Sequence, residues 1–462
     1  MKPVRLPYLL FLLSLQLALP ACGDGDSPSA ADRGSGSGGG GGDRTDGGAS
    51  GFGLADCEPI DPSLADADAG ELFDYPDVPT FDFYLPEGDW EALQANALAE
   101  EYTEAELCFE GKFVGVVGLR FKGSVGSLQD CFDDRGEMTC PRLSMKVKFD
   151  EYDTEQRLFG LKRLNFNAYR YDDSRMKENL TYDLFRAMGI VAPRASWAVL
   201  RVNGEQRGLY GMVEQVDGRF TDDRWPDHPD GNLYKEVWPT LATPVRALNG
   251  LRTNEDAADV DAYVAFAEAL EAAADDDEVL SLLDEYLGLD YLARYMAVDD
   301  VTACYDGVTY FWTDGVDTTN HNYYMYEEGP EQFTLVPWDV ETSFWINPDH
   351  AAPHWTEIPE DCSETYPYWD GLARAPGCDR IFRAMASDLA GWRAAGQELM
   401  DGPFSIEAME ERIERYRDYM GDEARADPTP TVYGTFDGSV DYTRSVLPDL
   451  RDRFERLMAG QY

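Results

Sequence analysis

Hydrophobic and polar residues alternate along several short segments in the first half of the chain. Val117, Leu119 and Phe121 occupy every second position of one such segment, and residues 143–149 alternate apolar side chains with serine and lysine. A period of two is typical of a β-strand with one buried face. Similar patterns predict strands at 81–85, 108–113, 115–122, 158–167, 195–202 and 208–216. We therefore expect an antiparallel sheet up to about residue 217.

A second set of segments carries apolar residues every three or four positions, which is typical of α-helices. Residues 173–188 show this pattern with Met176, Leu180 and Leu184 on one face, and Gly189 marks the expected end of the helix. The same pattern predicts helices at 89–101, 260–273, 279–287, 291–303, 380–400, 406–419 and 442–458, with short strands at 322–326 and 332–337.

The two kinds of segment are largely separated along the chain. Strands dominate residues 57–217, and helices dominate residues 218–462. This order predicts an α+β protein with two lobes, a β-rich N-lobe at 57–217 and an α-rich C-lobe at 218–462. A cleft between two such lobes is a usual place for a binding site.

The first 56 residues lack the patterns of a folded domain. Residues 1–22 have a basic start, an apolar run and the tetrad Leu-Pro-Ala-Cys, similar to a bacterial lipoprotein signal peptide with Cys22 as the lipidated residue. An ordinary secretory signal or a short membrane anchor is the alternative. Residues 23–56 are rich in Gly, Ser and Asp, which predicts a flexible linker. We expect a lipid-anchored or secreted protein outside the cytoplasm.

Charge and cysteine content narrow the possibilities further. A net charge of -49 leaves little basic surface for phosphates, so nucleic-acid binding is excluded as a function. Seven cysteines follow Cys22, and in an exported protein six of them are expected to pair. Spacing favours Cys131 with Cys140 and Cys362 with Cys378, which leaves Cys57 for Cys108, and Cys304 as a buried free thiol.

Two short blocks combine apolar residues with oxygen ligands. The first is His321 to Tyr326 and contains Asn322, and the second is Pro337 to Glu341 and contains Asp339. A buried carboxylate needs a partner or a metal ion, and carboxylate and amide oxygens suit Mg²⁺. Asn322, Asp339 and Glu341 are therefore candidate metal ligands. The alternative is structural, with Asp339 capping a turn and Asn322 satisfying the backbone.

Other residues could complete a site for phosphoryl transfer, which needs a cation at the phosphates, a metal ion and a base. Lys146 and Lys148 lie on a predicted strand, and Glu178 on the following helix could orient a lysine. Glu214 ends the last predicted strand of the N-lobe, near where an adenine would lie, and Asp306 follows a helix as a candidate base. Each residue alone also has an ordinary surface explanation. The VAIK, HRD and DFG signatures of protein kinases are absent.

An ordered series of motifs resembles the CotH family of spore-coat-protein-H-like atypical secretory kinases. The series runs through Arg-Phe-Lys-Gly-Ser at 120–124, Lys-Val-Lys-Phe at 146–149, Phe-Gly-Leu-Lys-Arg-Leu-Asn at 159–165, Val-Asn-Gly at 202–204, Gly-Asn-Leu-Tyr-Lys at 231–235, His-Asn-Tyr-Tyr at 321–324 and Pro-Trp-Asp at 337–339. The resemblance implies a divergent protein-kinase-like fold that uses ATP and a divalent metal. It also implies that Asp339 binds metal, that Asp306 is the catalytic aspartate and that Asn322 is a second metal ligand.

Two departures from the family pattern affect the site. The family commonly has Pro-Trp-Asp-x-Asp, whereas Glu341 stands at the last position here. The spacing between Asp306 and the Asn-Tyr-Tyr block is long, so Asp314 or Asp317 is an alternative catalytic residue.

These observations lead to one expectation and two alternatives. We expect an extracytoplasmic kinase, attached to a membrane by its lipid, that transfers the γ-phosphoryl group of ATP to hydroxyls of an extracytoplasmic protein substrate with Mg²⁺ or Mn²⁺. The first alternative is an inactive surface scaffold with the same fold. The second is a Ca²⁺-dependent adhesion or binding protein.

Overall fold

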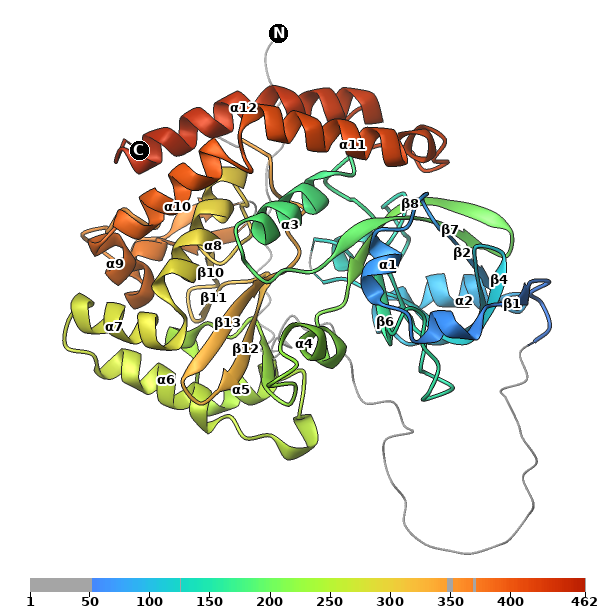
Figure 1. Ribbon diagram of the computed structural model, residues 1–462, viewed down its shortest axis with the longest axis horizontal. Helices are drawn as coiled ribbons and strands as arrows, with labels where there is room; N and C mark the ends of the chain where they lie inside the picture. Colours follow the sequence, from blue (N-terminus) through green and yellow to red (C-terminus); the bar gives the residue numbers. More distant parts are fainter. Residues whose placement is uncertain (1–51, 125, 347–351, 369–370, 462) are drawn as a thin grey trace, which may run out of the picture.

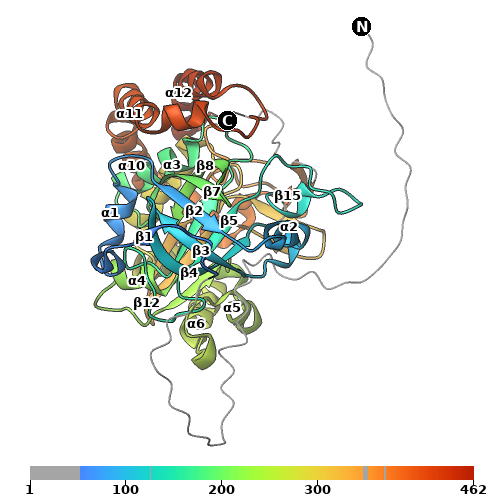
Figure 2. The same cartoon turned by 90° about the vertical axis from the view of Figure 1, so that its right-hand side faces the viewer.

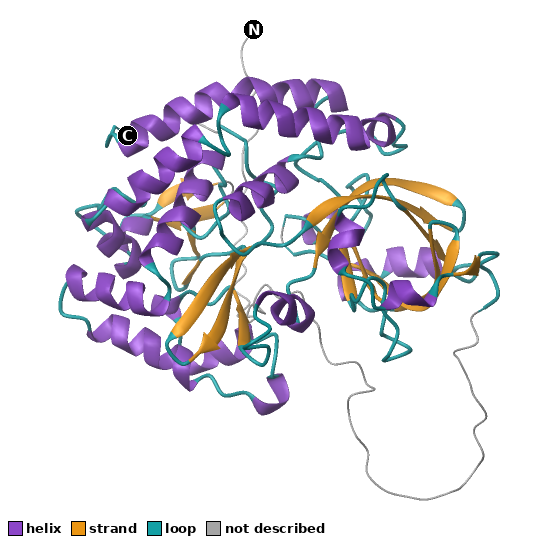
Figure 3. Cartoon of the chain, viewed as in Figure 1, coloured by secondary structure: helices purple, strands orange, loops and turns teal. Residues whose placement is uncertain are grey.

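A computed structural model describes residues 52–124, 126–346, 352–368 and 371–461 of the chain. It is a mixed α+β structure in which a β-barrel lies beside a larger, mainly helical part (Figure 1, Figure 3). In the perpendicular view the strands of the barrel lie in front, and the long helices α11 and α12 lie above them (Figure 2). Residues 1–22, with Cys22, lie outside the described residues, as does the linker up to residue 51.

Seven strands close the barrel in the order β4-β3-β2-β7-β8-β6-β5, with β5 returning to pair with β4. The short strand β1 (Glu58–Pro59) pairs with the first two residues of β4, Lys112 and Phe113. The barrel strands are β2 (Thr80–Tyr84), β3 (Thr103–Phe109), β4 (Lys112–Phe121), β5 (Met145–Lys148), β6 (Arg163–Asn167), β7 (Ala195–Val202) and β8 (Glu205–Glu214). Two small helices, α1 (Ala69–Phe73) and α2 (Asp89–Ala95), accompany them.

The sheet differs from the predicted antiparallel sheet in two respects. It closes on itself, and β2 pairs in parallel with β7, as β1 does with β4. Closure leaves no free edge among the seven strands, and one set of alternating side chains fills the interior. Leu119, Phe121 and Met145 belong to this interior core. Side chains at the positions between them point outward.

The described residues contain three disulfides, of which spacing favoured two and elimination left the third. Cys57 is bonded to Cys108, Cys131 to Cys140 and Cys362 to Cys378. Cys304 is a buried free cysteine, as expected. The start of the described chain is held by Glu106, whose carboxylate accepts hydrogen bonds from the backbone N–H groups of residues 53–55 at 2.6 to 2.8 Å.

The helical part surrounds two small antiparallel sheets, one with the order β13-β12-β9 and one with the order β11-β10-β15-β14. Its strands are β9 (Asn232–Lys235), β10 (Phe311–Thr313), β11 (Thr318–Thr319), β12 (Tyr323–Gly329), β13 (Gln332–Pro337), β14 (Tyr366–Tyr368) and β15 (Gly371–Arg374). Its helices are α4 (Gly218–Arg224), α5 (Pro244–Gly250), α6 (Asp261–Ala272), α7 (Asp276–Tyr286), α8 (Leu289–Thr302), α9 (Arg380–Ser387), α10 (Ala390–Asp401), α11 (Ile406–Arg425) and α12 (Phe436–Met458).

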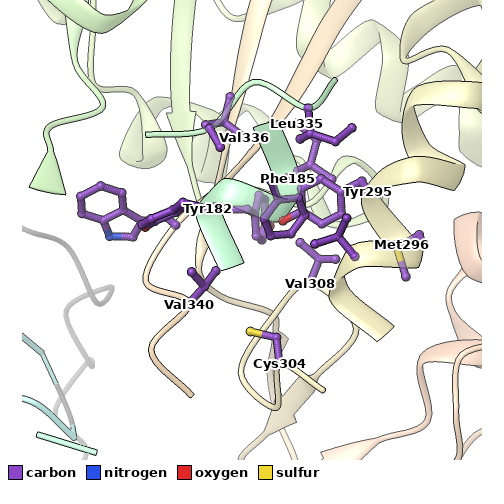
Figure 4. Close-up of a cluster of buried hydrophobic side chains, with 14 of the residues drawn as sticks. Tyr182, Phe185, Tyr295, Met296, Cys304, Val308, Leu335, Val336 and Val340 are labelled. Carbon is purple, nitrogen blue, oxygen red and sulfur yellow. The ribbon is translucent and has the colours of Figure 1, made fainter. Parts of the chain in front are cut away.

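Helix α3 (Lys177–Ala187) connects the two parts, although it lies between two barrel strands in the sequence. Tyr182 and Phe185 of α3 pack among Tyr295 of α8, Val336 of β13 and Val340, all in the core of the helical part (Figure 4). The helix therefore belongs to the helical part by its packing, and residues 57–217 do not form one separate core.

Several helix boundaries differ from the sequence prediction for local reasons. Helix α3 starts four residues later than predicted, because the carboxylate of Asp172 accepts hydrogen bonds from the backbone of residues 174, 176 and 177 and holds a turn there. The predicted helix at 380–400 is two helices, α9 and α10. No helix among the described residues has the length and apolar character needed to cross a membrane.

Candidate functional site

A cavity of about 380 Å³ lies between the barrel and the helical part. The barrel side contributes the connection after β4 and the end of β6, including Lys122, Ser124 and Asn167. The helical side contributes residues from several segments, including Asp306, Asn322 and Asp339. Polar and charged residues that are far apart in the sequence therefore face one shared cavity.

The β12–β13 hairpin brings the two ligand-bearing blocks together. Tyr323 at the start of β12 pairs with Pro337 at the end of β13, and the N–H of Trp338 donates to the carbonyl of Asn322 at 3.0 Å. Asn322 and Asp339 both have positive φ, 64° and 50°. A left-handed backbone is unfavourable for a residue with a Cβ and recurs at functional sites. The strand ends thus bend Asn322 and Asp339 toward the cavity.

Asp306 is held in place by neighbours in the cavity wall. The side-chain amide of Asn322 donates to Oδ2 and to the backbone carbonyl of Asp306, both at 2.8 Å, and Nε1 of Trp312 donates to Oδ1 at 3.1 Å. Burial raises the pKa of Asp306 to about 6, and Asp339 adds to this effect, whereas His321, Trp312 and Asn322 lower it. Asp306 is therefore a fixed carboxylate at the cavity surface.

His321 adds a basic group beside Asp306. Its Nδ1 lies 3.6 Å from a carboxylate oxygen of Glu236. Burial lowers the pKa of His321, but the interaction with Glu236 outweighs it, so the pKa lies above its usual value. The backbone N–H of Asn322 donates to the same carboxylate at 3.2 Å. Glu236 thus fixes both residues.

Lys122 supplies the cation on the barrel side of the cavity. It follows the last residue of β4, lies over the ring of Trp338 at 5.4 Å and donates to Oδ1 of Asn167 at 3.2 Å. Asn167 in turn donates to both carboxylate oxygens of Glu178, at 3.0 and 2.9 Å. Burial and Asp339 raise the pKa of Glu178 to about 7. A chain of hydrogen bonds therefore links helix α3 to the ammonium group in the cavity.

The carboxylates of Asp339, Glu341 and Glu178 lie close enough to influence one another electrostatically. Burial raises the pKa of Glu341 well above its usual value, and the neighbouring Asp339 and Glu178 raise it further. Neighbouring carboxylates raise one another's pKa because their negative charges repel, and a bound cation removes this repulsion. Asp339, Glu341 and the amide oxygen of Asn322 are donors of the type that Mg²⁺ accepts.

The same donor set is not a complete protein cage for a metal ion. Within the described ranges, no three His, Cys, Asp or Glu side chains come together as such a cage. Mg²⁺ in nucleotide sites is usually bound by one or two carboxylates together with phosphates and water, so a set of two carboxylates and an amide fits that ion.

The residues that line this cavity lie in a part of the chain that matches a known protein family. The family described as CotH kinase protein matches residues 119–449. The chain belongs to the CotH family. The match includes every cavity residue named above.

Two curated relatives are similar to part of the chain. The chain is 25% identical over 200 residues to the inner spore coat protein H of Bacillus subtilis, which is 40% of this chain and 51% of that protein. It is 25% identical over 215 residues to the invasin CotH7 of Rhizopus delemar, 45% of this chain and 33% of that protein. The chain therefore spans about half of one CotH relative and a third of the other.

A solved structure of the Shewanella oneidensis toxin–antitoxin system HipA and HipB with operator DNA covers 80% of the chain and 79% of its own chain. Its sequence identity is 10% and its TM-score is 0.31. A similarity at this level carries no argument about the CotH chain.

The structure places three of the predicted nucleotide-binding residues away from the cavity. Lys146 is fully buried on the outer side of β5, Lys148 forms an ion pair with Glu151 at 2.7 Å, and Glu214 forms buried ion pairs with Arg194 and Arg224. None of the three lines the cavity. All three lie on strands, as expected, and Lys148 and Glu214 have ionic partners there.

The alternative catalytic residues also lie elsewhere. Asp314 is exposed in the turn between β10 and β11, where it accepts backbone hydrogen bonds, and Asp317 pairs with Arg246 at the surface. Residues 310–319, which account for the long spacing between Asp306 and the Asn-Tyr-Tyr block, include this hairpin. Its Trp312 reaches back to Asp306, which lines the cavity, whereas Asp314 and Asp317 do not line it.

Sequence reasoning missed Lys122, Asn167, Tyr182 and Glu236. Lys122 carried a signal, because it ends an alternating strand immediately before the small residues Gly123 and Ser124. A side chain at the end of a strand can reach a ligand beside the following loop. Lys146 lies within β5, where neighbouring strands flank it. Nothing in the sequence marks Asn167, Tyr182 or Glu236, since their roles depend on contacts across the fold.

Proposed function

We propose that this chain is an extracytoplasmic kinase that transfers the γ-phosphoryl group of ATP to hydroxyl groups of proteins. One observation carries the proposal. A single cavity contains a buried lysine, an oriented aspartate and a set of metal-type oxygen donors, and it lies in a segment that belongs to the CotH kinase family. Phosphoryl transfer requires these three functions and little else from a protein.

Each part has a defined task in this proposal. Lys122 contacts the phosphates, and its position is fixed by Trp338 and by the hydrogen-bond chain through Asn167 to Glu178. Asp339 and Asn322, with Glu341, hold Mg²⁺ or Mn²⁺. The metal ion neutralises the charge of the phosphates when it is bound. The arrangement resembles the lysine–glutamate link of protein kinases, but here an asparagine stands between the two groups.

Asp306 is the residue that accepts the proton of the attacking hydroxyl. Its two oxygens are oriented by Asn322 and Trp312, so a substrate hydroxyl would meet a carboxylate in one fixed position. Positioning of this kind is the main contribution of an enzyme to phosphoryl transfer.

The compartment follows from separate observations. Three disulfides suit an oxidising environment. We extend this to a lipoprotein that is attached to a membrane through Cys22 and acts on extracytoplasmic proteins. Incorporation of labelled palmitate into the wild-type chain but not into Cys22→Ser tests the anchor.

Transfer itself is tested with the full chain, labelled ATP and Mg²⁺ or Mn²⁺, with and without a generic protein acceptor. We expect labelling to fall at least 100-fold in Asp306→Asn and in Asp339→Asn, since one base or one charge-stabilising group contributes about 10²–10⁴ in rate. Asp314→Asn is the matched control, because this aspartate is exposed and distant from the cavity, and it should label like the wild type.

The outcomes separate the possible functions. Labelling that persists in Asp339→Asn would remove the metal assignment. Labelling that depends on Asp314 and not on Asp306 would assign the role of catalytic base to Asp314. Absence of both ATP binding and labelling in the wild type would favour a surface scaffold of the same family.

A further inference from the structure

The connection between β4 and β5 forms a large share of the cavity wall. Its small residues Gly123, Ser124, Gly126 and Ser127, which we name the Gly-Ser loop, all line the cavity next to Lys122. Small residues without bulky side chains let a backbone approach phosphate oxygens closely. The position of this loop therefore determines how well a phosphate chain fits beside the lysine.

Hydrogen bonds inside the Gly-Ser loop give it a compact shape. The N–H of Ser124 donates to Oγ of Ser127 at 3.1 Å, and the carbonyl of Ser124 accepts from the N–H of Leu128 at 2.9 Å. Gly123 has φ of 143°, and a Cβ there would lie 2.7 Å from Oγ of Ser127. Glycine is thus required at this position for the loop to fold back on itself.

The far end of the loop is anchored in the barrel. Leu128 and Cys131 are 1% exposed and belong to the barrel core. Cys131 is bonded to Cys140, and the eight residues between them form an exposed turn with one backbone bridge, Phe132 to Met138. The disulfide therefore holds the returning chain against the end of the Gly-Ser loop.

The position of Cys140 is fixed by hydrogen bonds of the nearby Arg142. Arg142, two residues after Cys140, donates to the carbonyl of Ala168 at 2.8 Å and to the carboxylate of Asp427 at 2.8 Å. The disulfide consequently joins the Gly-Ser loop to a rigid point shared by the barrel and the connection between α11 and α12. Tyr171 adds a second tie, since its hydroxyl donates to the carbonyl of Gly126 at 2.9 Å.

We propose that the Cys131–Cys140 disulfide is a positioning element for nucleotide binding, which holds the Gly-Ser loop where its backbone meets the phosphates of ATP. The inference rests on the proposed function, because it assigns the phosphate end of the nucleotide to this wall of the cavity. The cysteines do not touch the nucleotide, and the effect is transmitted through Leu128 and the loop.

The test compares ATP and adenosine, because only ATP has the phosphates that the loop meets. Binding of each to the full chain is measured by calorimetry with Mg²⁺ for the wild type, Cys131→Ser/Cys140→Ser and the control Cys362→Ser/Cys378→Ser. We expect the Cys131/Cys140 variant to bind ATP about tenfold more weakly, about 1.4 kcal/mol, with adenosine binding unchanged. The control, which lacks a disulfide of the helical part, should bind both like the wild type.

A second variant does not depend on the disulfide for folding. Tyr171→Phe removes only the hydroxyl that holds Gly126, and it should weaken ATP binding several-fold and leave adenosine binding unchanged. Hydrogen exchange of residues 126–131 should be faster in both variants than in the wild type.

Three results would overturn the inference. Equal ATP affinity in the wild type and the Cys131/Cys140 variant would show that the disulfide does not position the loop. A parallel loss of ATP and adenosine binding would show general loosening. A wild type that binds no ATP would refute the proposed function first, and that result is distinct from the other two.

Discussion

Asp427 joins the connection between α11 and α12 to the barrel, and its removal is expected to destabilise the protein strongly. Its carboxylate accepts hydrogen bonds from Nη1 of Arg142 at 2.8 Å and from the N–H groups of Leu209 and Thr429 at 2.9 and 2.8 Å, and it also pairs with Arg175. The side chain is 1% exposed. One buried carboxylate therefore satisfies two buried guanidinium groups.

The magnitude follows from what Asp427→Ala leaves behind. Burial and the nearby Arg142 lower the pKa of Arg175, whereas Asp427 raises it, so the carboxylate offsets the repulsion between the two cations. Breaking a buried ion pair from one side costs about 3–5 kcal/mol, because the remaining charge stays buried. At an unfolding entropy of about 2.1 cal/mol/K per residue, roughly 400 folded residues give a fall in Tm of about 4–6 °C.

The assay is urea and thermal unfolding followed by circular dichroism. The matched control is Asp422→Ala, since Asp422 lies near the end of α11, is 98% exposed and pairs with Arg425 at 3.4 Å. An exposed pair contributes about 0–1 kcal/mol. A destabilisation of Asp427→Ala as small as that of the control would refute the reasoning.

The pH dependence gives an independent check of the same pair. Burial alone would raise the pKa of Asp427, but Arg142 and Arg175 outweigh it, so the folded pKa lies below the usual value. The stabilisation is therefore complete above the unfolded pKa of about 3.9 and is lost as the pH falls through the folded pKa. The difference between wild type and Asp427→Ala should be constant from pH 5 to 8 and shrink below about pH 4. If the stability difference between the wild type and Asp427→Ala grew on acidification, the pKa of Asp427 would be raised by folding and not lowered.

Three further predictions concern the cavity and the start of the folded chain. Lys122→Ala should weaken ATP binding in calorimetry by about 10–100-fold, as expected for a charge-assisted contact, whereas Lys146→Ala should lower stability and not selectively weaken phosphate binding; the reverse result would restore the original lysine assignment. Tyr182→Phe removes the hydroxyl that accepts from the N–H of Asp339 at 3.0 Å, so metal-dependent labelling should fall about 5–10-fold with Tm lowered by at most a few degrees; unchanged labelling would show that this contact does not position the aspartate. Glu106→Gln should make residues 53–55 sensitive to limited proteolysis and leave ATP binding intact; equal cleavage in wild type and variant would exclude a role for this carboxylate in holding the segment.

The sequence by itself determined the elements and the chemistry near the two ligand-bearing blocks. Period-two and period-3.6 patterns are local properties, so β7 and β13 were predicted with their observed bounds. Cysteine spacing favoured two of the observed pairs, Cys131–Cys140 and Cys362–Cys378, because short loops close at the lowest entropic cost, and elimination left the third pair. The strand ends at Asn322 and Asp339 stood out because polar oxygen donors interrupt an apolar run.

The tertiary structure decided which of the candidate residues share one space. Barrel closure places Lys122, which directly follows β4, at the cavity and leaves Lys146 of the neighbouring strand β5 buried on the outer face of the barrel. Packing of α3 into the helical core brings Glu178 to Asn167 and Tyr182 to Asp339. Such pairings depend on contacts between segments far apart in the sequence, and a single sequence carries no local signal for them. A local pattern can therefore name the chemistry of a site, and only the closed fold selects its members.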